Sequence, residues 1–125
     1  MLKLNYFLAD IFILSAEKQP IKLSWRKIEW LLSPGHALII PKRHVASYFD
    51  LTNHEREAMN VMLQYVKQKV DERYHPDGYN IGINVNEAAG QSVFHVHMHL
   101  IPRYKGDVPN PKGGVRGVIP SKQKY

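Results

Sequence analysis

The segment at residues 94–103, FHVHMHLIPR, constrains the fold of this 125-residue chain more than any other stretch. Histidine occupies every second position, and a single apolar residue separates each pair. Because successive side chains of a β-strand point to opposite faces, a strand places His95, His97 and His99 on one face. The opposite face then carries the apolar residues Phe94, Val96, Met98 and Leu100. A helix would scatter the same side chains around its circumference. The segment therefore predicts a half-buried strand with three imidazoles on its polar face.

Other segments also have the patterning of strands and turns. Short apolar or alternating runs, bounded by Gly, Pro and Asn, predict three more strands. We expect these strands at residues 4–14, 36–41 and 79–86, with turns at 33–35 and 87–90. Residues 24–32 fit either a short helix or another strand. The turn at 87–90 is short enough for an antiparallel hairpin between 79–86 and the histidine strand, which would place Asn84 beside the histidines.

A long helix is expected over residues 53–74. Thr52 and Glu55 have the spacing of a capping box, in which each side chain accepts a hydrogen bond from the other residue's backbone amide. Apolar residues then follow at helical spacing, namely Met59, Met62, Leu63, Val66 and Val70. The sequence His-Pro-Asp-Gly at 75–78 ends the helix.

The composition is that of one ordinary globular domain with a basic surface. With 44% hydrophobic residues the chain can bury its own core, and we expect a single domain over 1–125. The absence of cysteine excludes disulfides and thiolate metal sites and favours a reducing compartment. The net charge of +6 suits an anionic ligand but does not select one. Asn5 and Asp10 interrupt the first apolar run, so we expect no signal peptide or membrane span and a cytoplasmic protein.

Three imidazoles on one face have three chemical explanations, of which zinc binding is the first. In a strand the Cα atoms of His95 and His99 lie roughly 13 Å apart, whereas Zn–N bonds are about 2.0–2.1 Å. A third ligand would have to come from elsewhere in the chain, so we expect no metal. The second explanation is a polar patch of hydrogen-bonded histidines, which is unfavourable because charged rings at this spacing repel each other.

Phosphoryl chemistry is the third explanation, and it uses the most residues. Neutral imidazole is a nucleophile at pH 7, and its attack on phosphorus gives a phosphoramidate that water can cleave. Repulsion between the rings lowers the pKa of at least one of them and keeps it neutral. Asn84, Gln91 and Ser92 are uncharged donors suited to phosphate oxygens.

The segment QSVFHVHMHL resembles the signature of the histidine-triad (HIT) family of nucleotide hydrolases and transferases, His-φ-His-φ-His-φ-φ with φ apolar. The helix with its DLT entry also resembles the family. So do SPGHALIIPKRH (33–44), PDGYNIGIN (76–84), EAAGQS (87–92) and GDVPNPKGGVRGVIP (106–120). The last segment is similar to the tails of bacterial and fragile-histidine-triad-like members. The resemblance covers residues 33–120.

The resemblance implies a role for each histidine of the cluster. His97, the middle member, would be the nucleophile on the α-phosphate, and His99 would bind that phosphate and assist the leaving group. The main-chain carbonyl of His95 would orient the ring of His97, while His36 would form a hydrogen bond within the cluster. Positions that contact the phosphates correspond to Asn84, Gln91 and Ser92.

The resemblance also implies a fold and a reaction. The expected fold is α+β, an antiparallel sheet with one long helix and a short second helix, in a homodimer whose two sheets join. The expected reaction is cleavage at the α-phosphate of a dinucleoside polyphosphate or nucleoside phosphoramidate, through a histidine phosphoramidate, with release of a nucleoside monophosphate. Nucleotidyl transfer to phosphate or another acceptor is the alternative. No cofactor is required, although a divalent cation can accompany a polyphosphate substrate, and no membrane or specific nucleic-acid partner is expected.

One position departs from the family pattern. Where members carry the Asp or Asn that holds the ribose hydroxyls, this chain has Ile28. Either Glu29 or Asp10 holds the ribose instead, or the protein is a nucleotide-binding module with little turnover.

The tail at residues 106–125 is rich in Gly, Pro and Lys. Its composition alone allows a disordered terminus. The resemblance favours a tail that lies along the dimer, borders the neighbouring active site and helps to select the leaving group. Lys112 and Arg116 would then bring positive charge to an anionic leaving group.

Overall fold

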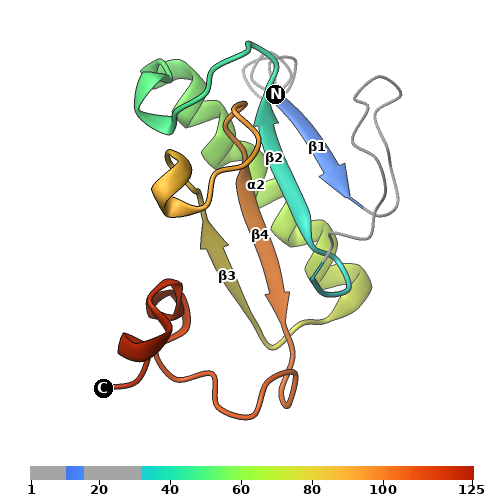
Figure 1. The fold of residues 1–125 in the computed structure, drawn as a ribbon. Helices are drawn as coiled ribbons and strands as arrows, with labels where there is room; N and C mark the ends of the chain where they lie inside the picture. The colour runs from blue at the N-terminus through green and yellow to red at the C-terminus, as the bar shows by residue number, and fades with distance from the viewer. Residues whose placement is uncertain (1–10, 16–31) are drawn as a thin grey trace.

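The computed structural model describes residues 11–15 and 32–125, which form an antiparallel sheet with a long helix packed against it (Figure 1). The sheet has the strand order β1-β2-β4-β3. Its strands are β1 (Ile11–Ser15), β2 (Ala37–Pro41), β3 (Gly78–Gly82) and β4 (Met98–Arg103). The expected α+β architecture with an antiparallel sheet is therefore confirmed. The expected elements at residues 4–10 and 24–31 lie outside the described residues.

The helix α2 (Asn53–Tyr74) has the bounds and the start that the sequence predicts. The amide of Glu55 donates to Thr52 Oγ1 at 3.1 Å, and the amide of Thr52 donates to Glu55 Oε1 at 2.9 Å. At the other end His75 adopts a left-handed conformation with φ 50° and ends the helix. In the described part of the chain α2 is the one α-helix, so the short second α-helix is not seen there. The other helical turns are the 3-10 segments Tyr48–Asp50, Glu87–Ala89, Gly114–Val118 and Pro120–Lys122.

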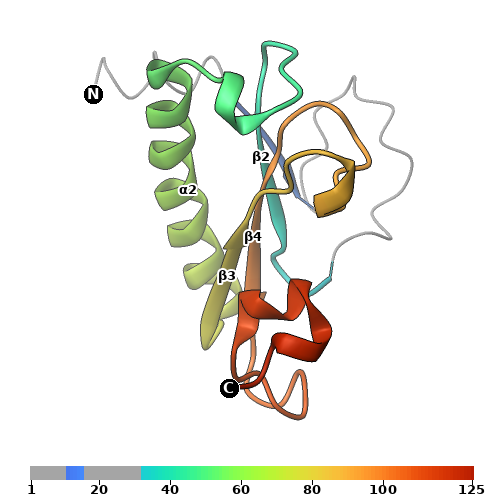
Figure 2. The same ribbon diagram turned by 60° about the vertical axis from the view of Figure 1, so that its left-hand side comes forward.

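The helix covers one face of the sheet, and His99 lies on the other. Met98 pairs with Ile39 and Leu100 pairs with Ala37, and these four side chains pack against α2. The helix contributes the buried side chains Ala58, Met59, Met62, Val66 and Val70. His99 pairs with Leu38 on one side and Gly82 on the other, so it points away from α2. Figure 2 shows α2 on one side of the sheet and the C-terminal segments on the other.

The predicted antiparallel pairing of the strand after the helix with the histidine strand is confirmed. The histidine strand is shorter than expected, however, and the connection between the two strands is longer than the predicted turn at 87–90. β4 begins only at Met98, and β3 ends at Gly82, so residues 83–97 form a long connection between them. Asn86 with φ 69° and Gly90 with φ 89° turn the chain away from the sheet in this connection. Phe94 is 50% exposed and does not belong to the core face, because the chain at this point has left the sheet.

The connection 83–97 is held to the segment that follows β2 rather than to β3. The amide of Val96 donates to the carbonyl of Val45 at 2.7 Å. Gln91 Nε2 donates to the carbonyl of Ala46 at 2.6 Å. These bonds hold the segment that contains His95 and His97 beside the residues that follow β2, before β4 begins.

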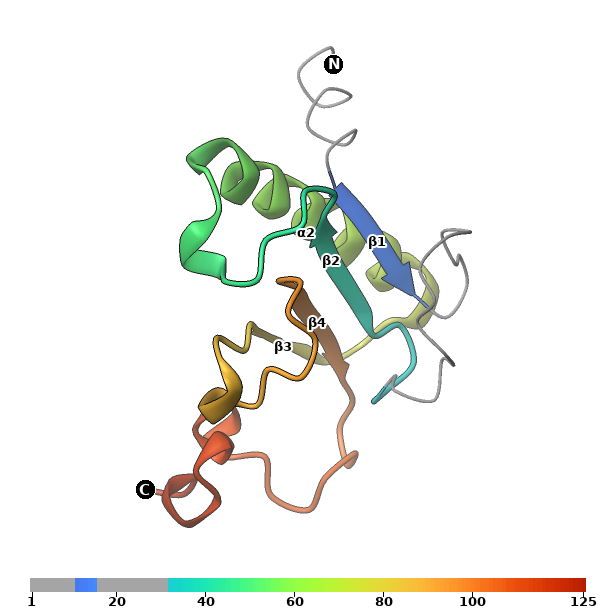
Figure 3. The ribbon, with the colours of Figure 1, turned by 45° about the horizontal axis from the view of Figure 1, so that its top comes forward.

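The tail folds back against its own chain. Gly113 has φ 88°, and a Cβ atom there would lie 1.9 Å from the carbonyl oxygen of Gln123, so only glycine fits this turn. Figure 3 shows the 3-10 segment η4 (Gly114–Val118) beside β3, at the edge of the sheet away from β1. Among the helices of the described residues, none combines the length and the apolar character that crossing a membrane requires.

Candidate active site

Of the four histidines named from the sequence, three bring their rings together from three parts of the chain. His36 precedes β2, His95 and His97 lie at the end of the connection before β4, and His99 is the second residue of β4. The ring centroids of His36 and His99 are 5.3 Å apart, and those of His97 and His99 are 5.2 Å apart. The ring of His95 lies instead against His44, at 5.0 Å. The rings of His36, His97 and His99 therefore form the histidine cluster, with His95 at its margin.

One hydrogen bond fixes which nitrogen of His97 can act as a nucleophile. His97 Nδ1 lies 3.0 Å from the main-chain carbonyl oxygen of His95, the contact that the family resemblance led us to expect. A carbonyl oxygen only accepts, so Nδ1 carries the proton. In the neutral ring the lone pair is then on Nε2.

A second chain of hydrogen bonds fixes the tautomers of His36 and His99. The amide of Leu32 donates to His36 Nδ1 at 3.0 Å, so the proton of the neutral His36 ring is on Nε2. His36 Nε2 lies 3.0 Å from His99 Nδ1, which must accept. His99 therefore carries its proton on Nε2. The main-chain amide of Leu32 thus determines, through His36, that His99 has an N–H donor at Nε2, on the side of the ring that faces away from His36.

Burial keeps this pair of rings uncharged at neutral pH. His36 is 2% exposed, and burial lowers its pKa. Burial, followed by the charges of His97 and His36, lowers the pKa of His99 to about 4. Desolvation thus contributes more to the lowered pKa of His99 than the mutual repulsion on which the sequence argument relied.

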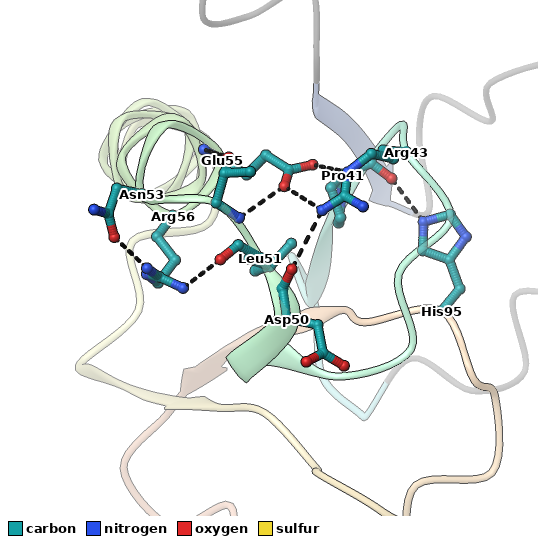
Figure 4. Close-up of polar contacts among 9 residues, drawn as sticks. Pro41, Arg43, Asp50, Leu51, Asn53, Glu55, Arg56 and His95 are labelled. Carbon is teal, nitrogen blue, oxygen red and sulfur yellow. Dashed lines mark hydrogen bonds and ion pairs between the residues drawn. The ribbon is translucent and has the colours of Figure 1, made fainter.

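The margin of the cluster is anchored to the end of β2 and the start of α2. His95 Nε2 donates to the carbonyl oxygen of Pro41 at 2.7 Å. Two residues after Pro41, Arg43 Nη2 and Nε bind the two carboxylate oxygens of Glu55 at 2.7 and 3.0 Å (Figure 4). Arg43, followed by the Thr52 amide, lowers the pKa of Glu55 to about 2. The strand, the helix and the histidine segment therefore meet at one rigid junction.

The three polar residues predicted to contact phosphate lie in different surroundings. Asn84 lines a pocket together with His99, and Ser92 is exposed outside that lining. Gln91 is 3% exposed, and its side chain already has three backbone partners. Its Oε1 accepts from the amide of Asn86 at 2.8 Å, and its Nε2 donates to the carbonyls of Ala46 and Val93. Phosphate contacts by these residues stay predictions, and for Gln91 they compete with bonds that shape the connection 83–97.

The structure adds two contributors that the sequence argument did not name. One is the amide of Leu32, and the other is Asn80, which lines the same pocket as His99. Asn80 lies four residues before Asn84 and therefore shares its face in a strand, so the alternation contained a signal for it. No sequence pattern identifies a main-chain amide as a tautomer control. Within residues 11–15 and 32–125, no three His, Asp or Glu residues are grouped as a metal site.

Comparison with known families agrees with this geometry. A family model described as the HIT domain matches residues 32–106. The chain belongs to the HIT family. The match includes the four histidines of the site and the helix α2.

This member of the HIT family is similar to proteins with named activities and to solved structures. It is 42% identical over 77 residues to the bis(5'-adenosyl)-triphosphatase of Dictyostelium discoideum, covering 62% of this chain and 52% of that protein. It is 34% identical over 76 residues to an AP-4-A phosphorylase of Mycobacterium tuberculosis, covering 60% of this chain and 39% of that protein. The crystal structure of a HIT family protein from Bacillus anthracis superposes with a TM-score of 0.65 at 30% identity, covering 78% of this chain and 61% of that one. The matches thus span about half or less of the two characterised proteins.

Proposed function

We propose that the protein is a nucleotide hydrolase that cleaves at the α-phosphate of a dinucleoside polyphosphate or a nucleoside phosphoramidate and releases a nucleoside monophosphate. The observation that carries this proposal is that two adjacent rings present different nitrogens: the neutral His97 ring, protonated on Nδ1, has its lone pair on Nε2, and the His99 ring is protonated on Nε2. A nucleophile and a hydrogen-bond donor side by side are what attack on a phosphate requires. The named activity of the Dictyostelium discoideum relative supports the same class of substrate.

The first step forms a covalent intermediate on His97. Its Nε2 lone pair attacks the α-phosphorus, and the bond from phosphorus to the leaving group breaks. With a dinucleoside polyphosphate, the leaving nucleotide takes that electron pair and departs as an anion. With a nucleoside phosphoramidate, the nitrogen takes the electron pair together with a proton from water and departs as ammonia. The ring then carries a positive charge, which the hydrogen bond from Nδ1 to the His95 carbonyl stabilises. His99 donates from Nε2 to a phosphate oxygen throughout.

Water completes the reaction in the second step. It attacks the phosphorus of the phosphoramidate, the P–N bond breaks with its electron pair returning to His97, and the nucleoside monophosphate is released. Inorganic phosphate in place of water gives a nucleoside diphosphate instead. The similarity to an AP-4-A phosphorylase makes this transfer the second candidate.

The test is the substitution His97→Ala, assayed on diadenosine triphosphate and adenosine 5'-phosphoramidate. We expect turnover to fall by at least about 10³-fold while the unfolding midpoint changes little, because the ring is only half-buried and supplies the nucleophile. His54→Ala, at an exposed position on α2, is the matched control and should keep full activity. Product analysis with added phosphate separates hydrolysis from transfer. Undiminished turnover in His97→Ala would contradict the mechanism, and binding without turnover by the unaltered protein would favour a binding module.

We also propose that the protein acts as a homodimer. β3 is an edge strand of the described sheet, with β4 as its one neighbour there, and its Ile81 is 48% exposed. A second copy that extends the sheet at this strand would pair with its main chain and bring neighbouring side chains next to Ile81.

A further inference from the structure

A pocket of about 540 Å³ lies between the histidine side of the sheet and the tail. His99, Asn80 and Ile101 line it from β3 and β4, and Gly114, Val115 and Val118 line it from η4. Lys112 and Arg116 do not line it, because both place their charged groups 5.1 Å from the centre of the Tyr125 ring. The expectation that these two cations meet the leaving group is therefore not supported by their placement. The tail contributes apolar side chains and main chain to the pocket.

Asn80 supplies this apolar pocket with an oriented donor. Arg103 Nη1 donates to Asn80 Oδ1 at 2.6 Å. Because a guanidinium group only donates, the atom facing it must be the amide oxygen, and Nδ2 must face the other way. Arg103 is held in turn by Asp107, through Nε at 2.8 Å and Nη2 at 2.9 Å.

The free end of this amide faces the tail. A Cβ atom built on Gly114 would lie 3.4 Å from Asn80 Nδ2, so this nitrogen is directed at the wall formed by η4. Within the described residues Nδ2 donates to no protein acceptor. Its two N–H bonds are therefore available to a ligand in the pocket.

The register of the sheet places this donor within reach of a bound substrate. Asn80 pairs with Ile101, and Gly82 pairs with His99, so Asn80 lies one step further along the same face, roughly 7 Å from the histidine. A group attached to a phosphate at His99 would enter the pocket and pass Asn80. The pocket volume is within the range of about 300–1,000 Å³ that small-molecule sites occupy.

We infer that Asn80 is a specificity-determining residue that donates from Nδ2 to an acceptor atom of the leaving group. The group that fits is flat and largely apolar and carries a hydrogen-bond acceptor, as the base of the second nucleoside does. The apolar side chains of Ile101, Val115 and Val118 would pack against its faces. The inference rests on the proposed function, because it concerns which leaving group the histidine cluster releases.

Two substitutions at Asn80 test the inference. Asn80→Asp is nearly isosteric and still accepts from Arg103, but it has no Nδ2 donor; Asn80→Ala removes the donor without adding charge. Asn110→Asp is the control, because it makes the same chemical change at an exposed position outside the pocket. The two substrates are diadenosine triphosphate, whose leaving group carries a base, and adenosine 5'-phosphoramidate, whose leaving group is ammonia.

We expect both Asn80 variants to lower kcat/KM for diadenosine triphosphate by about 10-fold or more, as the loss of a substrate hydrogen bond does. The phosphoramidate should be hydrolysed within about 2-fold of the unaltered rate, and Asn110→Asp should change neither. Equal losses on both substrates, or no loss on either, would overturn the inference. A loss confined to Asn80→Asp would also overturn it, since charge repulsion would then explain the effect.

A binding measurement separates this inference from the proposed function. If the unaltered protein hydrolyses neither substrate, the proposed function fails, and calorimetry decides the role of Asn80. Weaker binding of diadenosine triphosphate to Asn80→Ala, with AMP binding unchanged, supports the inference. Unchanged binding of both ligands, or no binding of either, overturns it.

Discussion

At the scale of single residues, His36 determines the state of His99 without reaching the substrate itself. Its Nδ1 accepts a hydrogen bond from the Leu32 amide, and its Nε2 therefore carries the proton and donates to His99 Nδ1. A glutamine can reproduce both contacts, since its oxygen can accept from Leu32 and its nitrogen can donate to His99. A leucine of similar size can reproduce neither. His36 is therefore a positioning residue whose role can be separated from packing.

We expect His36→Leu to lower kcat by about 10- to 100-fold with little change in KM, and His36→Gln to restore most of the loss. Nitrogen NMR of His99 supplies the independent measurement. The unaltered protein and His36→Gln should show a proton on Nε2 and none on Nδ1, whereas His36→Leu should show both tautomers. Equal kcat values for the two variants, with one His99 tautomer in both, would show that the contact has no positioning role.

The lowered pKa of His99 makes the stability of the folded protein depend on pH, and the sign of this dependence follows from the direction of the shift. Its folded pKa of about 4 lies below the ordinary value of 6.5, so the unfolded chain binds more protons between these values. The stability that the neutral ring contributes is complete above about pH 6.5 and is lost as the pH falls toward 4. A proton added at Nδ1 would also break the bond from His36.

Sequence reasoning at this scale succeeded for side chains that a pattern distinguishes. The alternation of residues 94–100 located His97 and His99, and the spacing of Thr52 and Glu55 located a cap that the structure contains. It did not anticipate local partners that no spacing encodes. Gln91 was expected to contact phosphate, and that contact stays a prediction, but no pattern indicated the three backbone groups that bind its amide.

At the scale of elements, the accuracy of prediction followed the range of the interactions involved. α2 was predicted residue by residue because its cap, its apolar stripe and its end are all local features. The bounds of β3 and β4 were predicted less well, because a strand ends where its neighbour stops pairing. The chain after Gly82 leaves β4 and is held by Ala46 and Val45, which are distant in sequence.

The junction between β2 and α2 leads to a prediction about stability. Glu55 closes the capping box and binds Arg43, and these bonds lower its pKa to about 2. Because the folded pKa lies below the unfolded value of 4.5, the stabilisation is complete above about pH 4.5 and is lost as the pH falls toward 2. We expect Glu55→Gln to lower the free energy of unfolding by about 2 kcal/mol at pH 7.

Urea denaturation at several pH values measures this effect. The difference between Glu55→Gln and the unaltered protein should shrink steadily below pH 4.5. Glu57→Gln, an exposed change of the same kind on the same helix, should cost less than about 0.5 kcal/mol. A difference for Glu55→Gln that stays constant down to pH 3 would mean that charge is not the source of the stabilisation.

At the scale of the whole molecule, the tail decides whether each active site is built from one chain or two. The resemblance to the family led us to expect a tail that borders the site of a neighbouring chain. In the structure η4 lies against β3 of its own chain and lines the pocket of its own His99. The turn at Gly113 sends the tail back in this direction. Asp107, which holds Arg103 in place, precedes that turn, so residues 112–125 can be removed without disturbing the anchor of Asn80.

Mixed dimers distinguish the two arrangements, provided that sedimentation equilibrium first confirms the proposed homodimer. In these dimers one chain carries His97→Ala and an intact tail, and the other has an active cluster but lacks residues 112–125. If each tail serves its own chain, the only active site in the mixed dimer has no tail. Its preference for diadenosine triphosphate over adenosine 5'-phosphoramidate should then equal that of the fully truncated protein, which we expect to be reduced about 10-fold. If the tail serves its neighbour, the intact tail of the inactive chain reaches the active site, and the mixed dimer should regain the preference of the full-length protein. The structure predicts the first result, because Val115 and Val118 line the same pocket as the His99 of their own chain.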